Sequence, residues 1–242
     1  MKAMIFAAGL GTRLRPLTDN VPKALIEING RTLLEICINR LKEIGINDIV
    51  VNVHHHANQI IKYLERNNNF GINIKFSDET DLLLDTGGGL KKATHLLIGN
   101  EPILLHNVDI ISNINLSQLI SYHNNNNSLS TLAVMNRLSN RSFLINEKGI
   151  LCGWQNTTTG EKIIVRDHDK LLQPVGYCGI AVIQPKFLKK ITENNVFSII
   201  TVFLRLASKE EICTMLFNNV FWTDVGTIEK LEEIRKIESK ML

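Results

Sequence analysis

Residues 4–18 read MIFAAGLGTRLRPLT, and the pair Pro22-Lys23 follows shortly after them. The apolar run Met4–Ala8 is too short for an independent helix and predicts a buried strand. The run stops at Gly9 and Gly11, where glycine permits positive φ and lets a ligand approach the main chain. Successive free N–H groups in such a loop bind anions. The stretch therefore predicts a strand followed by a loop for a phosphate-bearing ligand.

Three cations, Arg13, Arg15 and Lys23, lie in or just after this loop. Two familiar phosphate loops fit poorly. The dinucleotide fingerprint G-x-G-x-x-G needs a glycine where this chain has Leu14, and Pro16 interrupts the helix that should follow. The Walker spacing G-x-x-x-x-G-K-[ST] is absent. An ordinary glycine turn is the simpler alternative, and the cluster of cations disfavours it.

The run G-x-G-T-R-L-R-P-L-T followed by P-K resembles the N-terminal motif of the sugar-phosphate nucleotidylyltransferases. The resemblance implies a reaction of an NTP with a sugar 1-phosphate that yields an NDP-sugar and pyrophosphate. It implies that Mg²⁺ is the cofactor. It assigns nucleotide binding to Ala8, Gly9, Gly11, Thr12 and Arg13. Arg13 is expected at the departing pyrophosphate, and Lys23 on the α-phosphate or the sugar phosphate; both are expected to be catalytic.

Composition sets limits on the class of protein. The 242 residues are 44% hydrophobic and 21% charged, so the chain can bury a substantial core. A net charge of +3 is too slight to argue for nucleic acid or an anionic membrane. The four cysteines are far apart, without zinc spacing or a signal segment. We therefore expect a cytoplasmic protein with free thiols, a monomer or small homo-oligomer, that binds neither nucleic acid nor membrane.

Hydrophobic periodicity alternates between helix and strand in the first part of the chain. Helices are predicted at 32–44, 58–67, 90–97 and 116–124, and strands at 48–53, 72–76, 102–106 and 130–135. This alternation predicts an α/β, Rossmann-like doubly wound fold with a mostly parallel sheet, which is the nucleotide-diphospho-sugar transferase type that the resemblance implies.

After about residue 141 the pattern changes to a small added β region. Short strands are predicted at 142–145, 150–155, 177–183, 211–217 and 220–222, and helices at 186–191, 197–206 and 227–239. A polar stretch spans residues 156–169. No linker divides the chain, so one domain, residues 1–242, is expected. Residues 1–140 would form the nucleotide-binding part, and 141–242 the sugar-phosphate side with a C-terminal helix.

Two aspartates are candidates for a metal site. Asp109 follows the strand predicted at 102–106, and ligands of open α/β sheets bind beyond such strand ends. Asp224 lies just before the last helix, where it could instead be a helix cap, although Thr227 can fill that role equally well. Mg²⁺ typically takes one or two carboxylates plus phosphate oxygens. The resemblance assigns both aspartates to Mg²⁺ and to catalysis, with Val108 where the family usually has glycine.

A second glycine run, Asp85–Gly89, precedes a predicted helix. Backbone N–H groups of Gly87 and Gly88 could face a ligand there; a flexible loop is the alternative. The resemblance favours contact with the nucleotide base and sugar, and T-G-G-G is similar to the branch that includes N-acetylmuramate 1-phosphate uridylyltransferase. Residues 177–180, Y-C-G-I, resemble a family segment F-S-G-I near the sugar, which places Gly179 at the sugar phosphate.

The substrate remains open at this level. UTP with an N-acetylated sugar 1-phosphate such as N-acetylmuramate 1-phosphate leads, followed by GTP with mannose or heptose 1-phosphate, and CTP with phosphocholine. A regulatory homologue that binds a sugar nucleotide without turnover is disfavoured by the intact set Arg13, Lys23, Asp109 and Asp224. Residues 54–56 are three histidines that cannot all face one metal, so a loop at the rim of a site is the better interpretation.

Overall fold

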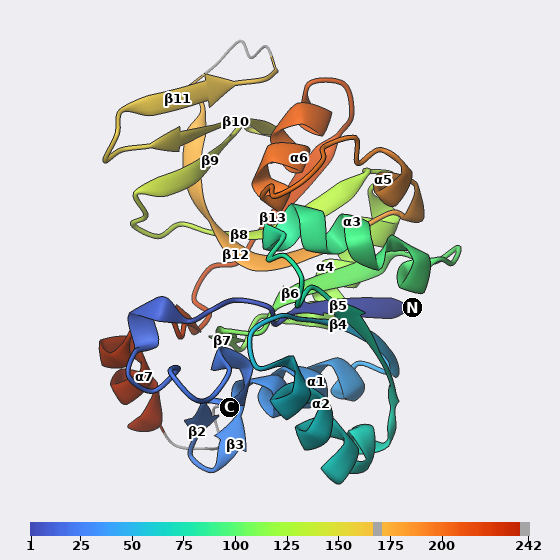
Figure 1. The fold of residues 1–242 in the computed structure, drawn as a ribbon. Helices are drawn as coiled ribbons and strands as arrows, with labels where there is room; N and C mark the ends of the chain where they lie inside the picture. Colours follow the sequence, from blue (N-terminus) through green and yellow to red (C-terminus); the bar gives the residue numbers. More distant parts are fainter. Residues whose placement is uncertain (167–170, 238–242) are drawn as a thin grey trace.

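The computed structural model describes residues 1–166 and 171–237, and shows an α/β fold around a mixed sheet (Figure 1). The parallel core consists of β6 (Ile103–Asn107), β1 (Lys2–Phe6), β4 (Asp48–Val53) and β5 (Asn73–Asp78), in that order. The predicted α/β fold with a parallel sheet is confirmed for this core, and the strands beyond β6 are mostly antiparallel to their neighbours.

Strand β1 is apolar from Ala3 to Phe6 because both of its faces are buried. Successive side chains of a strand point to opposite faces of the sheet. Ala3 and Ile5 belong to one hydrophobic cluster, and Met4 and Phe6 to another. Helices therefore cover both faces, as a doubly wound sheet requires.

Two groups of helices provide these covers (Figure 1). The first cluster includes residues of α1 (Leu33–Glu43), α2 (Ala57–Arg66), α4 (Leu116–Asn125) and α7 (Ile228–Arg235). The second includes residues of α3 (Asp85–Leu97), α5 (Pro185–Lys189) and α6 (Ile199–Ala207). The described helices are all too short or too polar to cross a bilayer.

The antiparallel part is built on the long strand β12 (Gln173–Ile183), which pairs with β6, β8 (Ser130–Met135) and β9 (Arg141–Ile145). Strand β13 (Ile212–Leu216) pairs with β8, and β10 (Leu151–Asn156) joins β9 to β11 (Glu161–Ile164). The polar stretch predicted at 156–169 contains β11, a strand that the sequence did not predict, and residues 167–169 of this stretch lie outside the described residues. All four residues of β11 are exposed, so no alternation of buried side chains marks this strand, and pairing with β10 forms it.

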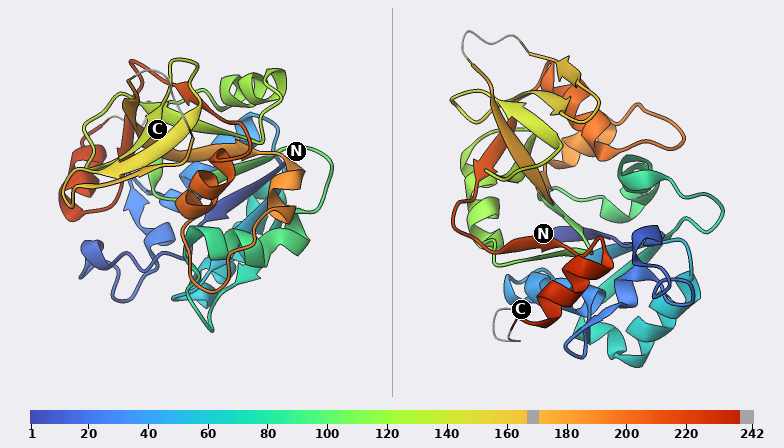
Figure 2. Two further views of the ribbon diagram at one scale, coloured as in Figure 1. Left: turned by 90° about the horizontal axis from the view of Figure 1, so that it is seen from above. Right: turned by 90° about the vertical axis from the view of Figure 1, so that its left-hand side faces the viewer.

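The end of the chain returns to its beginning (Figure 2). Strand β14 (Trp222–Asp224) pairs with β7 (Ile110–Ser112), and α7 contacts β2 (Glu27–Ile28), which pairs with β3 (Arg31–Thr32). The guanidinium of Arg235 donates to Glu27 O at 3.0 Å. Residues 238–239 of the predicted last helix lie outside the described residues. The division of the chain into nucleotide and sugar-phosphate parts stays a prediction, because this last segment packs on the first part.

Candidate active site

Three strands of the parallel core end at one cavity of about 420 Å³, here called the strand-end pocket. It is lined by Phe6–Gly9 after β1, Lys23, Asn52 of β4, Glu79, Leu83, Asp85–Thr86, Asn107–Asp109 after β6, and Val196. Ligands of α/β sheets bind beyond such strand ends. The structure thus brings together Ala8, Gly9, Lys23 and Asp109 from the residues that the sequence selected.

The loop after β1 turns sharply at Gly11, whose φ is 65°. The carbonyl oxygen of Gly11 accepts hydrogen bonds from Leu14 N and Thr18 Oγ1, both at 2.8 Å. A Cβ at Gly11 would lie 2.9 Å from Thr18 Cγ2, whereas one at Gly9 would meet nothing within 4 Å. Gly11 is therefore needed for the turn, and Gly9 leaves the main chain open to a ligand.

Lys23 and Asp109 form a hydrogen-bonded ion pair at the floor of the strand-end pocket. Their side chains are only 11% and 22% exposed, so solvent screens the pair less than it would at the surface. Lys23 begins the short 3₁₀ helix Lys23–Leu25, and Asp109 follows β6. The sequence selected both residues but did not show that they pair.

The ribbon β7–β14 places Asp224 next to Asp109. Val225 N donates to Asp109 O at 2.8 Å, and Asp224 lies opposite Ile110 in the register. Asp224 Oδ2 accepts from Lys230 Nζ at 2.7 Å. Thr227, rather than Asp224, caps α7, so the alternative reading of Asp224 as a helix cap is wrong.

Gly226 allows Arg13 and Asp224 to approach each other. A Cβ at Gly226 would lie 2.6 Å from Asp224 Oδ1 and 2.9 Å from Arg13 Nη2. Arg13 is an exposed residue of the 3₁₀ helix Thr12–Leu14, which is remote in sequence from residue 226. The structure therefore brings Arg13 to the second aspartate, although neither residue lines the strand-end pocket.

The second glycine run has a different role from the one expected. The N–H groups of Gly87 and Gly88 both donate to Phe197 O, at 3.0 and 3.1 Å. A Cβ at Gly87 would lie 2.4 Å from the Phe197 ring, and one at Gly88 would lie 2.8 Å from Asn195 O. The expectation that these N–H groups are free to face a ligand is wrong in this structure, and helix α3 begins at Asp85 rather than at residue 90. Nucleotide contact by the two glycines stays a prediction.

A buried polar network forms part of the wall of the strand-end pocket, and sequence reasoning missed it. Asn52 Oδ1 accepts from Ala7 N at 2.6 Å, and Asn52 Nδ2 donates to Glu79 Oε1 at 2.7 Å. Glu79 Oε2 accepts from Leu84 N at 3.1 Å. Burial raises the pKa of the Glu79 carboxyl, with the Asn52 hydrogen bond opposing the shift. The one signal was a polar residue, Asn52, inside an apolar strand.

A second cavity of about 700 Å³, here called the hairpin pocket, lies between the β9–β11 strands, β12 and α6. Its lining includes the guanidinium groups of Arg137 and Arg141 and the aromatic rings of Phe143, Trp154 and Tyr177. Gly179 packs beside Asn107, which lines the strand-end pocket. Its φ is +73°, and a Cβ there would be 3.0 Å from Asn107 Nδ2. Cys178 is buried, so its thiol does not face either cavity.

A sequence profile of the family described as Nucleotidyl transferase matches residues 2–143, more than half of the chain. The chain belongs to this family. The resemblance noted in the sequence is thereby confirmed, and the protein is an enzyme, a nucleotidyltransferase.

Relatives extend the likeness beyond the profile. The chain is 28% identical over 242 residues to the N-acetylmuramate alpha-1-phosphate uridylyltransferase of Neisseria meningitidis serogroup B, covering 98% of each chain. The protein of the same name from Caulobacter vibrioides is 43% identical over 111 residues, 45% of this chain and 46% of that one. The mannose-1-phosphate guanyltransferase of Yarrowia lipolytica is 29% identical over 228 residues, 93% of this chain and 61% of that one.

Solved structures confirm the nucleotidyltransferase fold. The inositol-1-phosphate CTP transferase of T. maritima superposes with a TM-score of 0.77 at 18% identity, covering 99% of this chain and 95% of that chain. A UDP-glucose pyrophosphorylase complexed with UDP-glucose gives a TM-score of 0.76 at 19% identity, covering 97% and 96%. These identities are low, so the likeness concerns the fold alone.

The two aspartates of this nucleotidyltransferase fit a magnesium ion in their donor chemistry. Each uses Oδ2 for a lysine and has Oδ1 as a further oxygen ligand. Within the described residues there is no group of three or more His, Cys, Asp or Glu side chains suited to a metal. A metal here would therefore rely on two carboxylates and on phosphate oxygens of the substrates, a ligand set that suits Mg²⁺.

The histidines at 54–56 lie at the edge of this region. His54 Nδ1 lies 2.5 Å from Glu79 O, and His56 Nε2 lies 3.2 Å from Asp19 O. The rings of His55 and His56 are 3.7 Å apart. His54 thus contacts the loop that carries Glu79, and His56 contacts Asp19 in the segment that follows β1.

Proposed function

We propose that this sugar-1-phosphate nucleotidyltransferase transfers a uridylyl group from UTP to an N-acetylated sugar 1-phosphate such as N-acetylmuramate 1-phosphate. The observation that carries the proposal is the strand-end pocket, in which Gly9, Lys23 and Asp109 converge beside Asp224. The choice of UTP and of the sugar is supported by the Neisseria relative, which matches along nearly the whole chain.

The chemistry follows from charge and position. An oxygen of the acceptor's phosphate attacks the α-phosphorus of the NTP and forms a new P–O bond. The bond from the α-phosphorus to the bridging oxygen breaks, and its electron pair leaves with pyrophosphate. The attacking phosphate is already an anion, so no general base is required. Catalysis then depends on positioning and on stabilising developing negative charge.

The proposed roles combine the family resemblance with the position of the residues that line the pocket. Ala8, Gly9, Gly11 and Thr12 would hold the triphosphate through the loop after β1. Arg13 would stabilise the departing pyrophosphate. Lys23 is already fixed on Asp109 at the pocket floor, where it would contact the α-phosphate. Gly179 lies beside Asn107, where it would border the sugar phosphate.

Asp109 and Asp224 would hold Mg²⁺, which when bound neutralises phosphate charge. Lys23 and Lys230 now balance the two carboxylates, so these lysines keep the acidic pair compatible with anionic substrates. Chelation by EDTA is expected to stop turnover, and added Mg²⁺ to restore it.

The proposal is tested by pyrophosphate release with Mg²⁺, a panel of UTP, GTP, CTP and TTP, and a panel of sugar 1-phosphates. UTP with N-acetylmuramate 1-phosphate is expected to give the highest kcat/KM. Preference for another NTP would overturn the uridylyl assignment. No release with any pair, together with measurable binding of an NDP-sugar, would favour a non-catalytic binding protein.

A guanylyltransferase acting on mannose or heptose 1-phosphate is the second candidate. It is supported by the Yarrowia relative, which is 29% identical over 93% of this chain. The same panel decides between them, because a guanylyltransferase would release pyrophosphate fastest with GTP.

A further inference from the structure

The hairpin pocket borders the strand-end pocket at two places. Val196 lines one cavity and Ser198 the other, so residues 196–198 separate them. Tyr177 lines the hairpin pocket, and two residues later Gly179 packs beside Asn107, which lines the strand-end pocket. A molecule in the hairpin pocket can therefore present one end to the reaction centre.

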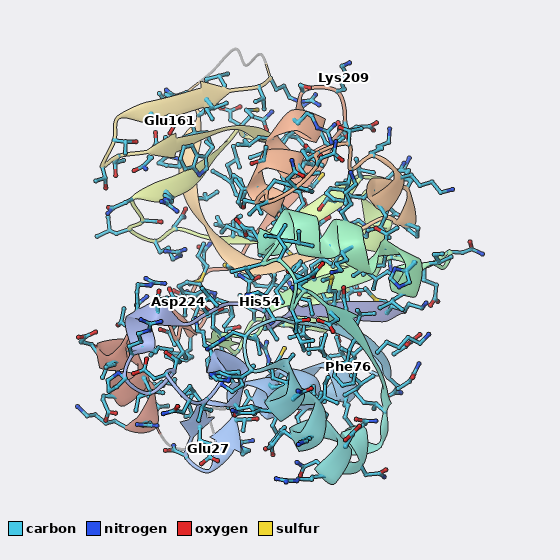
Figure 3. All side chains as sticks on the ribbon, viewed as in Figure 1. Glu27, His54, Phe76, Glu161, Lys209 and Asp224 are labelled. Carbon is cyan, nitrogen blue, oxygen red and sulfur yellow. The ribbon has the colours of Figure 1, made fainter. Side chains whose placement is uncertain are left out.

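Arg137 is held at the side of the hairpin pocket that faces Asp224. Its guanidinium donates to Tyr177 O at 3.0 Å and lies over the Trp222 ring, 4.3 Å from the centroid. Trp222 belongs to β14, the strand that carries Asp224, and Figure 3 shows Asp224 below the hairpin that carries Glu161. Gly176 leaves room for the arginine, because a Cβ there would lie 2.6 Å from Arg137 Nε.

The protein leaves the charge of Arg137 incompletely satisfied. Arg137 Nε is buried without a hydrogen-bond partner in the described part of the chain. A buried donor without an acceptor is unfavourable, and cation–π contact with Trp222 only partly offsets this. Arg137 also lines the hairpin pocket, so an anionic ligand there would balance the charge of its guanidinium.

Arg141 brings a second guanidinium into the same cavity. It begins β9, opposite Asn156 of β10, and both residues line the hairpin pocket. Among residues 1–166 and 171–237, neither Arg137 nor Arg141 makes an ion pair with a carboxylate. Glu161 also lines the pocket, so the positive charge of the lining exceeds the negative.

Arg137 and Arg141 together supply more positive charge than one phosphate group needs, so one of them can bind a second anion. Aromatic rings on one side and hydroxyl and amide groups on the other also suit a sugar. We propose that the hairpin pocket holds the acceptor, and that it selects a sugar 1-phosphate with a second anionic group. Arg137 holds the 1-phosphate, since it lies on Trp222, and Arg141 binds the second anion. This inference rests on the proposed function.

The test measures acceptor binding by calorimetry separately from pyrophosphate release. Two pairs of acceptors differ in one anionic group. N-acetylmuramate 1-phosphate is compared with N-acetylglucosamine 1-phosphate, which lacks the lactyl carboxylate, and glucose 1,6-bisphosphate with glucose 1-phosphate. In at least one pair the doubly anionic member is expected to bind about 10- to 100-fold tighter, the range of a charge-assisted hydrogen bond. The pair that responds distinguishes a carboxylate from a phosphate.

Variants assign the effect to the two arginines. Arg141→Gln is expected to remove the higher affinity of the doubly anionic acceptor. The affinity of the singly anionic member of the same pair is expected to change by no more than about twofold. Arg137→Gln is expected to weaken every acceptor, with partial rescue in Arg137→Lys. The matched control is Lys162→Gln, which removes a cation from the same hairpin at a position outside the pocket lining.

Three results would overturn the inference. The first is that both members of each acceptor pair bind with the same affinity. The second is that Arg141→Gln weakens both members of the responding pair equally. The third is that Lys162→Gln changes acceptor affinity as much as Arg141→Gln does. Each can occur while pyrophosphate release proceeds normally. Conversely, the absence of pyrophosphate release with any substrate pair contradicts the proposed function and leaves the binding comparison valid.

Discussion

At the scale of single residues, the Lys23–Asp109 ion pair allows the charge of Asp109 to be tested by substitution. Asp109→Asn keeps an oxygen that can accept from Lys23 but removes the charge. We expect kcat to fall by about 10²- to 10³-fold, in the range seen when one stabilising group is lost from an active site, while circular dichroism shows a folded protein. The control is Asp81→Asn, an exposed carboxylate paired with Lys92. Unchanged turnover in Asp109→Asn would remove Asp109 from the metal site.

Gly226 offers a second test at this scale. In Gly226→Ala the new Cβ would displace Asp224 Oδ1 and Arg13 Nη2, which are the ends of side chains rather than backbone. We expect a nearly normal thermal midpoint but kcat reduced about 10- to 100-fold, because small misplacements in an active site are costly. Gly99→Ala is the matched control, since a Cβ there meets nothing within 4 Å. Equal activity of the two variants would show that the approach of Arg13 to Asp224 is unimportant.

At the scale of elements, Asn52 and Glu79 connect three segments. They tie the end of β1 through β4 to the loop that leads into α3. In Glu79→Gln the amide can accept only one of the two hydrogen bonds that the carboxylate accepts. We expect the free energy of unfolding to fall by about 1–3 kcal/mol, the usual cost of a buried donor left unpaired, and KM for the NTP to rise.

Urea unfolding and NTP titration measure these two effects. Glu65→Gln on the exposed face of α2 is the control for loss of one carboxylate. A variant as stable as the wild type, with an unchanged KM for the NTP, would mean that the network does not shape the pocket.

At the scale of the whole molecule, two buried histidines make stability depend on pH. Burial lowers the pKa of His123 to about 4 and, with the nearby Arg40, that of His106 to about 3. The amide of Gln184 donates to His123 Nε2 at 2.9 Å, so a proton there would break this bond. Both folded pKa values lie below the ordinary value of 6.5. These histidines are therefore protonated in the unfolded chain at pH values where they stay neutral in the folded chain. The free energy of unfolding thus falls as the pH decreases from 6.5 toward 4.

For His123 alone, this linkage lowers the free energy of unfolding by about 2 kcal/mol between pH 7 and pH 5. Urea unfolding at both pH values is expected to show that His123→Gln loses about 2 kcal/mol less than the wild type on acidification. Equal losses would mean that His123 is protonated in the fold.

The sequence predicted much of this architecture because the decisive signals are local. Apolar runs buried on both faces of the sheet marked β1, β4 and β6, and helical periodicity marked α1 and α2. The exposed strand β11 was missed, because its own residues show no hydrophobic alternation and only its pairing with β10 defines it. The hydrogen bonds that occupy the N–H groups of Gly87 and Gly88 were missed for a related reason, because their acceptor is Phe197 O, more than a hundred residues away.

By itself, the sequence determined the family and the parallel core, and it selected Gly9, Lys23, Asp109 and Asp224 as candidates for the site, because the motif and the strand ends that carry them are local. Only the tertiary structure decided which groups meet. It paired Lys23 with Asp109, set Asp224 beside Asp109 through the β7–β14 ribbon, and brought Arg137 to Trp222. These contacts join segments that are distant along the chain, and their geometry depends on how the sheet is ordered and packed.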